Sequence, residues 1–280
     1  MDNLAYLMQG VVQPVTGSSV LTSTSPFLNH LGLRDWVATH YLRRNGPDRP
    51  PSSDTAAGLI PALLELTDGP RVERLIAAER ETNPRFRAWL DEGFIPHHTL
   101  EFFDGYPPGS FGAIYHGYLT SRGLQPNLAR GTAFEPSSAY EFMRFRFGQI
   151  HDLEHVITGG GFDTLGELLP YFSRLANVHK HLSPELAGAF TQLYVLGGYR
   201  FPVRAGLHYP QVYLTVLDLV QRGIRIGLDS EPIFMARFED VLHLSPPEAR
   251  EALGVRGAED IDTVAASAIF DDAEGVACAV

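Results

Sequence analysis

Helix signals recur along almost the whole chain, whereas the apolar–polar alternation that marks strands is scarce. Ser25 and Pro26 are typical of these signals, because a cap residue followed by proline suits the first turn of a helix. We expect helices over 26–44, 55–66, 71–81, 84–93, 113–123, 139–157, 163–178, 184–196, 210–222, 232–242 and 246–253. The sequence therefore predicts an all-α fold class with a single multi-helix domain.

The two ends of the chain differ from this helical middle. Residues 1–24 contain GSSVLTSTS and show little periodicity, so we expect a flexible N-terminal arm. After Leu253 the chain carries acidic residues at 259, 260, 262, 271, 272 and 274, with Arg256 alone against them. This composition predicts an acidic, solvated C-terminal tail over 255–280 and leaves 25–254 as the helical domain.

Composition excludes several classes of function. The 280 residues, 44% of them hydrophobic and 20% charged, suffice to bury a full core. Because Cys278 is the single cysteine, neither a disulfide framework nor a cysteine zinc cluster is possible within the chain, and any metal must be held by histidine and carboxylate. The formal net charge of -11 repels phosphate backbones, so nucleic acid is not expected as a partner.

The sequence also bears on location. No apolar run approaches the roughly 20 residues that span a bilayer. The chain begins with Asp2 near its start and has no Lys or Arg before Arg34, which argues against a secretory signal and a mitochondrial presequence. We therefore expect a cytoplasmic protein, with peripheral contact at the inner membrane face only through apolar surface.

The stretch HDLEHVITGGGFDTLGE, residues 151–167, gathers two histidines and several carboxylates among apolar neighbours. Successive residues of a helix turn by ~100°, so His151, Asp152 and His155 fit on one face, with Asp152 at its edge. Two imidazoles at i and i+4 can bind one ion, as in other helical metal motifs. This helix therefore carries half of a candidate metal site.

The glycine run Gly159–Gly161 ends that helix and frees the chain to turn back. A second helix starting at 162–164 would place Glu167 about one turn inside it and return this carboxylate towards the histidines. Two neutral imidazoles and two carboxylates form a mixed donor set that suits zinc, iron or manganese and leaves positions for water or substrate. The segment thus predicts a helix-turn-helix metal site.

Other interpretations of these residues remain open. A bare HDxxH also arises as a chance pair of core histidines or as a solvated acidic helix end. Phosphohydrolases named for a histidine–aspartate pair need an earlier histidine and a late aspartate, and His116 and Asp218 fit that pattern only by force. We expect Glu154 to be exposed or to face a substrate, without an assigned role. His97 and His98, which follow a proline, are expected on a loop surface.

The whole segment 151–167 resembles the zinc-associated signature of the coenzyme Q (ubiquinone) biosynthesis protein family called Coq-four, which reads HD, two residues, H, eleven residues, E. The resemblance extends to YPPGSFGAIYHGYL at 106–119 and to RFRFGQIHD at 144–152. Downstream, LDLVQRGIR and ARFEDVLHLSPPEAREALGV are similar to the family's closing helices. Similar segments cover residues 55–255 in the same order, so the chain resembles a divergent member of this family.

The resemblance implies an all-α domain that works on prenylated quinone precursors at a membrane face and that often forms homodimers. It also implies zinc as the bound divalent ion. The ligands that it implies are His151, Asp152, His155 and Glu167. Two positions depart from the family pattern: Glu154 replaces an apolar residue, and no Trp precedes the Glu of ARFED, which leaves Glu239 open as the equivalent of the family's late Glu.

Two roles in quinone synthesis follow from the resemblance. In the first, the protein replaces the ring carboxylate of a prenylated hydroxybenzoate with a hydroxyl, by oxidative decarboxylation that uses the metal and dioxygen. Zinc cannot change oxidation state, so a redox role would require iron, manganese or cobalt. In the second, the protein is a non-catalytic scaffold that binds the isoprenoid tail and organises other quinone-biosynthesis enzymes.

The departures leave a third reading, a metalloenzyme for another aromatic or prenylated metabolite in a specialised pathway. Stretches such as YPQVYLTVLDLV, residues 209–220, are candidates to line a lipid groove. Apolar residues at this spacing are also what any core helix shows, and core is the interpretation that we favour.

Overall fold

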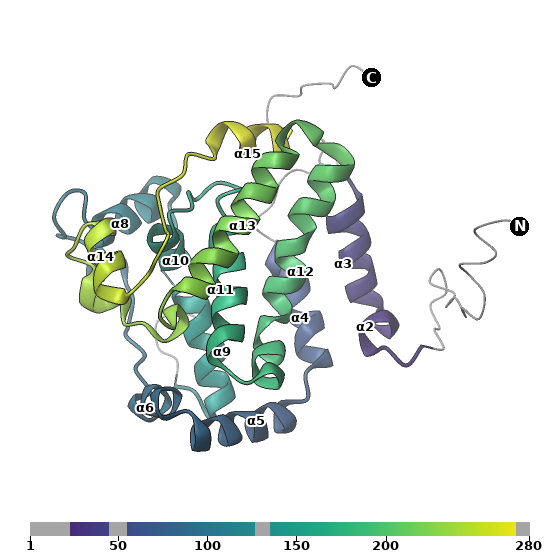
Figure 1. Cartoon of the computed structure of the whole chain (residues 1–280), viewed down its shortest axis with the longest axis horizontal. Coiled ribbons are helices and arrows are strands. Elements are labelled where there is room, and N and C mark those ends of the chain that lie inside the picture. Colours follow the sequence, from purple (N-terminus) through teal and green to yellow (C-terminus); the bar gives the residue numbers. More distant parts are fainter. Residues whose placement is uncertain (1–22, 45–54, 127–134, 273–280) are drawn as a thin grey trace, which may run out of the picture.

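The computed structural model describes residues 23–44, 55–126 and 135–272, which form helices joined by short connections (Figure 1). In chain order the elements are α2 (Pro26–Asn29), α3 (Leu31–Leu42), α4 (Thr55–Leu66), α5 (Gly69–Thr82), α6 (Pro84–Glu92), α7 (Leu100–Phe103), α8 (Phe111–Arg122), α9 (Ala139–Gln149), α10 (His151–Thr158), α11 (Leu168–His181), α12 (Pro184–His208), the 3-10 turn η1 (Pro210–Val212), α13 (Tyr213–Asp229), the 3-10 turns η2 (Ile233–Met235) and η3 (Phe238–Val241), α14 (Pro246–Leu253) and α15 (Val264–Phe270). In these described ranges, extended pairing is limited to one isolated bridge between Gly160 and Ile261. The predicted all-α, single-domain fold is confirmed.

Three long helices, α11, α12 and α13, run side by side through the centre of the molecule (Figure 1). Glycines let them approach closely: a Cβ added at Gly227 of α13 would lie 2.3 Å from the Ser173 carbonyl oxygen of α11. On α12, a Cβ added at Gly197 would lie 2.6 Å from the ring of Tyr171. Because glycine has no side chain, the central helices can pack closely against each other at these positions.

The remaining helices cover this central group. α3 and α4 pack on α12 and form an apolar cluster around Trp36 and Leu59. α5, α6 and α9 contribute to a second cluster, which includes Trp89. The largest cluster joins α8, α10 and the centre, and α10 buries Leu153 and Ile157 in it. Because α10 contacts α8, α11 and α14, its orientation is fixed, and so are the side chains that it directs towards α11.

The boundaries of several helices differ from those expected from the sequence. The expected helix over 139–157 starts as predicted, since the Ser138 side chain accepts a hydrogen bond from the Glu141 N–H. It breaks at Ile150, whose φ of -93° and ψ of -3° separate α9 from α10. The expected helix over 232–242 is replaced by the two short 3-10 turns η2 and η3, and at the start of η2 the Ile233 N–H donates to the Asn177 side chain.

The C-terminal segment contradicts the expectation of a solvated tail as far as residue 272. There α15 packs onto the domain, and the ring of Phe270 is fully buried. The acidic composition was misleading because its carboxylates have specific partners, as where Asp271 accepts a hydrogen bond from the Thr164 hydroxyl. The rest of the expected tail, 273–280, and residues 1–22 of the expected arm lie outside the described residues.

A helix that crosses a bilayer needs roughly 20 mainly apolar residues. None of the described helices is both long and apolar enough to cross a membrane. α12 is the longest, with 25 residues, but it contains Arg200, Pro202 and Arg204.

Replacing Gly227 with alanine tests the packing of α13 on α11. The new Cβ would also lie 2.8 Å from the Ala176 Cβ and 2.9 Å from the Asn177 nitrogen, and these atoms cannot rotate away. We expect Gly227→Ala to lower the free energy of unfolding by about 2 to 3 kcal/mol in urea denaturation. Gly188→Ala in α12 is the control, because nothing lies within 4 Å of its added Cβ. Alanine there should stabilise by up to about 1 kcal/mol, and equal stability of the two variants would contradict the packing argument.

Candidate metal centre

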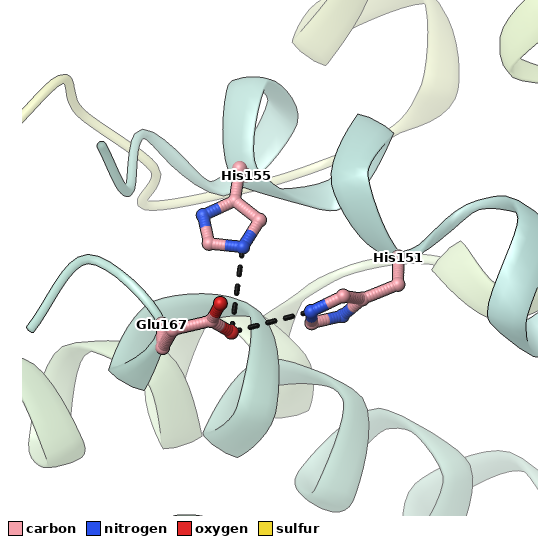
Figure 2. Close-up of side chains that lie close together, drawn as sticks. All are labelled: His151, His155 and Glu167. Atoms are coloured by element: carbon pink, nitrogen blue, oxygen red, sulfur yellow. Dashed lines mark ion pairs between the residues drawn. The ribbon is translucent and has the colours of Figure 1, made fainter. Parts of the chain in front are cut away.

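α10 and α11 bring two histidines and one carboxylate to a common point (Figure 2). The Oε2 atom of Glu167 lies 3.2 Å from Nε2 of His151 and 3.4 Å from Nε2 of His155. Figure 2 shows the carboxylate at the start of α11 pointing towards both rings. Ligand atoms about 2.1 Å from a tetrahedral ion lie about 3.4 Å apart, so these distances suit one shared cation.

A hydrogen bond prepares the His155 ring to bind an ion. Its Nδ1 atom lies 2.8 Å from the Gly161 carbonyl oxygen. A carbonyl oxygen only accepts, so Nδ1 carries the hydrogen, and in the neutral ring Nε2 presents its lone pair towards Glu167. Phe162 stacks on the same ring with centroids 5.1 Å apart. Histidines that bind metals are usually oriented by such partners behind the ring.

The three side chains differ in exposure, which gives the site one open side. His155 is 2% exposed, whereas the side chains of His151 and Glu167 are 24% and 32% exposed. The Oε2 atom of Glu167 is itself buried and has no well-aligned hydrogen bond within the described part of the chain. Because buried polar atoms are normally satisfied, this oxygen fits a cation, while the open side leaves room for water or substrate.

The glycine run makes the turn that the sequence predicted. Gly159 ends α10 in the left-handed region, with φ of 82°, and its N–H donates to the His155 carbonyl. The second helix starts later than expected, because Asp163 Oδ1 accepts a hydrogen bond from the Gly166 N–H and holds the intervening residues in turns. Glu167 is therefore the cap residue of α11 and does not lie one turn inside it.

A C-terminal brace, formed by Ile261, Thr263 and Ser267, holds this turn from outside. The Thr263 hydroxyl donates to Asp163, 2.7 and 2.8 Å from its two oxygens, and the Ser267 hydroxyl donates to the same carboxylate. The Ile261 N–H donates to the Gly159 carbonyl at 3.0 Å. A Cβ at Gly159 would lie 1.9 Å from the backbone of this segment, so only glycine fits the contact.

The charges of the site depend on one another. Burial opposes the charged form of His155, but Glu167 and Asp152 outweigh burial and raise the pKa of His155 to about 9. Burial likewise opposes the charge of Glu167, and the two imidazoles outweigh it and hold the pKa of Glu167 well below its usual value. Without a cation, a proton on His155 thus compensates the carboxylate, and a bound metal ion would displace it.

Asp152 is the one predicted ligand that the structure does not bring into the group. The residues whose ligand atoms lie within 4.8 Å of one another are His151, His155 and Glu167. Burial and then the charge of the nearby Asp152 carboxylate raise the pKa of the Tyr115 hydroxyl, so this carboxylate lies close to Tyr115 of α8. Its role as a fourth ligand stays a prediction.

Glu154 does not face solvent or a substrate, contrary to the expectation from helical spacing. It is 2% exposed and forms a buried ion pair with Arg174 of α11, whose Nε donates to Oε1 at 2.9 Å. The same guanidinium donates to the Phe147 carbonyl and to the Tyr194 hydroxyl, each at 2.7 Å. The unusual carboxylate therefore joins α10 to α11, the two helices that carry the candidate metal ligands.

A second buried ion pair lies beneath the approach to α10. Arg146 of α9 donates to both oxygens of Glu239 in η3 at 2.8 Å, and His98 Nε2 donates to the same carboxylate at 2.9 Å. His98 is 1% exposed, which corrects the expectation of a loop-surface histidine. Burial opposes the charge of Glu239, but its two partners outweigh it and lower the pKa of Glu239 to about 2.

Comparison with known families places these residues in context. The family model described as coenzyme Q (ubiquinone) biosynthesis protein Coq4 matches residues 55–258, which contain the complete turn and the three clustered residues. Among curated proteins, a mitochondrial ubiquinone biosynthesis protein COQ4 from Paracoccidioides brasiliensis is 26% identical over 208 residues, covering 73% of this chain and 68% of the relative. Its counterpart from Meyerozyma guilliermondii is 22% identical over 162 residues, covering 58% and 48%.

A solved structure is similar in fold. It is a crystal structure from Nostoc punctiforme PCC 73102, of a protein provisionally named for ubiquinone biosynthesis. The TM-score is 0.57 with 18% identical residues, over 81% of this chain and 96% of the other. This likeness supports the arrangement of helices alone.

Replacing His155 with alanine tests metal binding. We expect metal affinity to fall by at least the roughly 10–100-fold that follows from losing a partner behind a ligand, measured by metal analysis of protein purified without chelator. Asp152→Asn tests whether Asp152 is a fourth ligand. It should lower metal affinity as much as His155→Ala only if Asp152 binds the ion. His243→Ala, at an exposed histidine, is the control and should keep its metal. Unchanged metal content in folded His155→Ala protein would exclude an ion at this site.

The Glu239 ion pair predicts how stability depends on pH. The folded-state pKa of Glu239, about 2, lies below the unfolded value of 4.5, so its contribution is present above pH 4.5 and is lost as pH falls through about 2. We expect Glu239→Gln to lower the free energy of unfolding at pH 7 by about 3 to 5 kcal/mol. The difference from wild type should shrink towards pH 2 in urea titrations. Exposed Glu251→Gln is the control, and a penalty that stayed constant with pH would contradict the assignment.

Proposed function

This chain belongs to the coenzyme Q (ubiquinone) biosynthesis protein Coq4 family, and on that premise we propose that it is a metal-dependent enzyme acting on a prenylated hydroxybenzoate. The reaction is oxidative decarboxylation of the ring. The observation that carries the proposal is the convergence of His151, His155 and Glu167, with the His155 tautomer set by the Gly161 carbonyl. Such a donor set with an open side is typical of catalytic rather than structural metal sites.

The proposed reaction balances as a mono-oxygenation. The bond between the ring carbon and the carboxylate breaks and carbon dioxide leaves, while a bond between that ring carbon and a hydroxyl forms. One oxygen atom of dioxygen enters the ring and the other becomes water, with two electrons and two protons from an external two-electron donor. A bound divalent ion would supply a Lewis acid for the substrate oxygens and, if redox-active, a site for electron transfer.

The residues of the chain have separate tasks in this proposal. His151, His155 and Glu167 hold the ion, and Asp152 is the proposed fourth ligand. The Gly161 carbonyl fixes the His155 ring. Partial exposure of His151 and Glu167 supports entry of substrate from one side, while the buried His155 keeps water from the other.

The proposed reaction restricts which metal ion the site can use. Zinc is the ion that the family resemblance implies, but zinc cannot change oxidation state, so the proposed step requires iron, manganese or cobalt. The donor set of imidazole and carboxylate suits these metals as well. A homodimer that meets its prenylated substrate at a membrane face belongs to the same proposal. The curated relatives are named as mitochondrial proteins, and a cytoplasmic location for this chain stays a prediction.

Metal replacement tests the proposed reaction. Metal-free protein is reloaded with zinc, ferrous iron, manganese or cobalt and given a prenylated para-hydroxybenzoate, a two-electron donor and isotope-labelled dioxygen. We expect mass spectrometry to detect the hydroquinone with one labelled oxygen for a redox-active ion and none with zinc. His155→Ala should form no product with any ion. Product formation that persists in this variant after its metal is lost would rule out catalysis at this centre.

Exposed apolar residues support a second candidate, a non-catalytic scaffold that binds the isoprenoid tail. α13 buries Val216 and Leu219 as a core helix does, but its other side presents a groove of about 410 Å³. The apolar residues of this groove are Leu217, Val220, Ile224 and Leu228. The His155→Ala variant separates the two candidates, because equal retention of prenyl lipid and equal rescue of quinone synthesis would favour the scaffold.

A further inference from the structure

The buried arginines of the protein differ in how their charge is compensated. Arg146 pairs with Glu239, Arg174 with Glu154 and Arg250 with Asp260. Arg200 of α12 is as buried as Arg250, each being 8% exposed, yet no carboxylate of the described residues lies within 4.0 Å of it. A buried guanidinium without an anion in contact is destabilising, so this one calls for a partner that the described residues do not supply.

The hydrogen bonds of Arg200 leave most of its donors available. Its Nε donates to the Gly197 carbonyl, one turn earlier on α12, at 2.9 Å. Its guanidinium carbon lies 4.0 Å from the ring centroid of Phe201. Throughout the described part of the chain, the two terminal nitrogens have no protein acceptor, although neither is fully shielded from water. The planar end of the side chain is therefore free to accept an anion in a two-point contact.

Arg200 lies beside the metal centre. The ring of Tyr171 contacts the ring of His151 edge to face, with centroids 5.7 Å apart. The other side of Tyr171 lies against Gly197, whose carbonyl accepts the Arg200 hydrogen bond. Burial lowers the pKa of Arg200, and Tyr171 and then Glu167 are the first groups to oppose that shift, so the guanidinium is within electrostatic range of the clustered carboxylate.

We propose that Arg200 binds the carboxylate of an aromatic acid next to the candidate metal centre. A bidentate contact would orient this carboxylate and hold the ring beside the Tyr171 face. The proposal rests on the proposed function for the choice of aromatic acid, but its physical basis is the unpaired buried charge. It assigns to α12 the recognition of the group that the reaction removes, and to α10 and α11 the binding of the ion.

Ligand binding tests this assignment without turnover. The probes are a short-chain prenylated para-hydroxybenzoate and its neutral primary amide, titrated by calorimetry into metal-free and zinc-loaded protein. Wild type should prefer the carboxylate. Arg200→Gln should weaken carboxylate binding by about tenfold or more and leave amide binding unchanged, since a hydrogen bond to a charged group is lost. Metal content should equal that of wild type.

Two further variants keep the test decisive. Arg200→Lys retains the charge but not the planar fork, so its carboxylate affinity should lie between those of wild type and Arg200→Gln, and it replaces the glutamine variant if that one does not fold. Arg222→Gln, at an exposed arginine paired with Asp218, is the control and should change neither affinity. An equal preference of wild type for the two probes, or an unchanged preference in the Arg200 variants, would overturn the proposal.

The two proposals fail separately. If the Arg200 variants lose carboxylate selectivity but no ion supports product formation, the anion site stands and the proposed reaction falls. If product forms and selectivity is unchanged, the reaction stands and Arg200 has no role in recognising the carboxylate.

Discussion

Reversal of the chain at Gly159–Gly161 is the constraint on which the candidate metal centre depends. α10 must end within one residue of Thr158, and α11 must return close enough for Glu167 to meet both imidazoles. Each glycine is tightly enclosed: a Cβ on Gly160 would lie 2.4 Å from the Gly166 carbonyl, and one on Gly161 would lie 2.5 Å from the Asp163 carboxylate. The turn is thus shaped by what surrounds it, and its carbonyl at Gly161 also sets the tautomer of His155. The glycine run therefore both turns the chain and orients the His155 ring.

The buried charged side chains differ in whether an opposite charge compensates them. The Arg174–Glu154 and Arg146–Glu239 pairs are well hydrogen-bonded, and both lie close to the elements that carry the candidate metal ligands. Pairs of this kind contribute little net stability over an apolar core, but removing one partner is strongly destabilising, so they penalise any other arrangement of the helices. Arg200 is unlike them because, among the described residues, no carboxylate lies within 4.0 Å of it. Positions that depart from the usual rules of folding, such as a buried charge without a counter-ion, are often functional sites.

Much of this architecture could be predicted from sequence, because it depends on local signals. Helical spacing identified the all-α class, the glycine run identified the turn, and the i and i+4 spacing put His151 and His155 on one face. The failures involve contacts between residues distant in sequence. The start of α11 depends on Asp163, whose partners Thr263 and Ser267 lie 100 and 104 residues away. Likewise, nothing local indicated that Glu154 would meet Arg174, or that Arg200 would have no ion-pair partner among the described residues. Pairing across the fold cannot be read from spacing along one helix.

The C-terminal brace has a consequence for the order in which the molecule is made. Ribosomal synthesis produces the ligand-bearing segment first, and about a hundred residues must follow before Thr263 and Ser267 exist to hold Asp163. Until then the nascent chain has its donor side chains but lacks the hydrogen bonds that the C-terminal brace makes to the turn. If the proposed ion binds here, its loading would be tied to completion of the fold rather than to emergence of the motif, and chains interrupted before residue 267 would present the imidazoles without a fixed geometry.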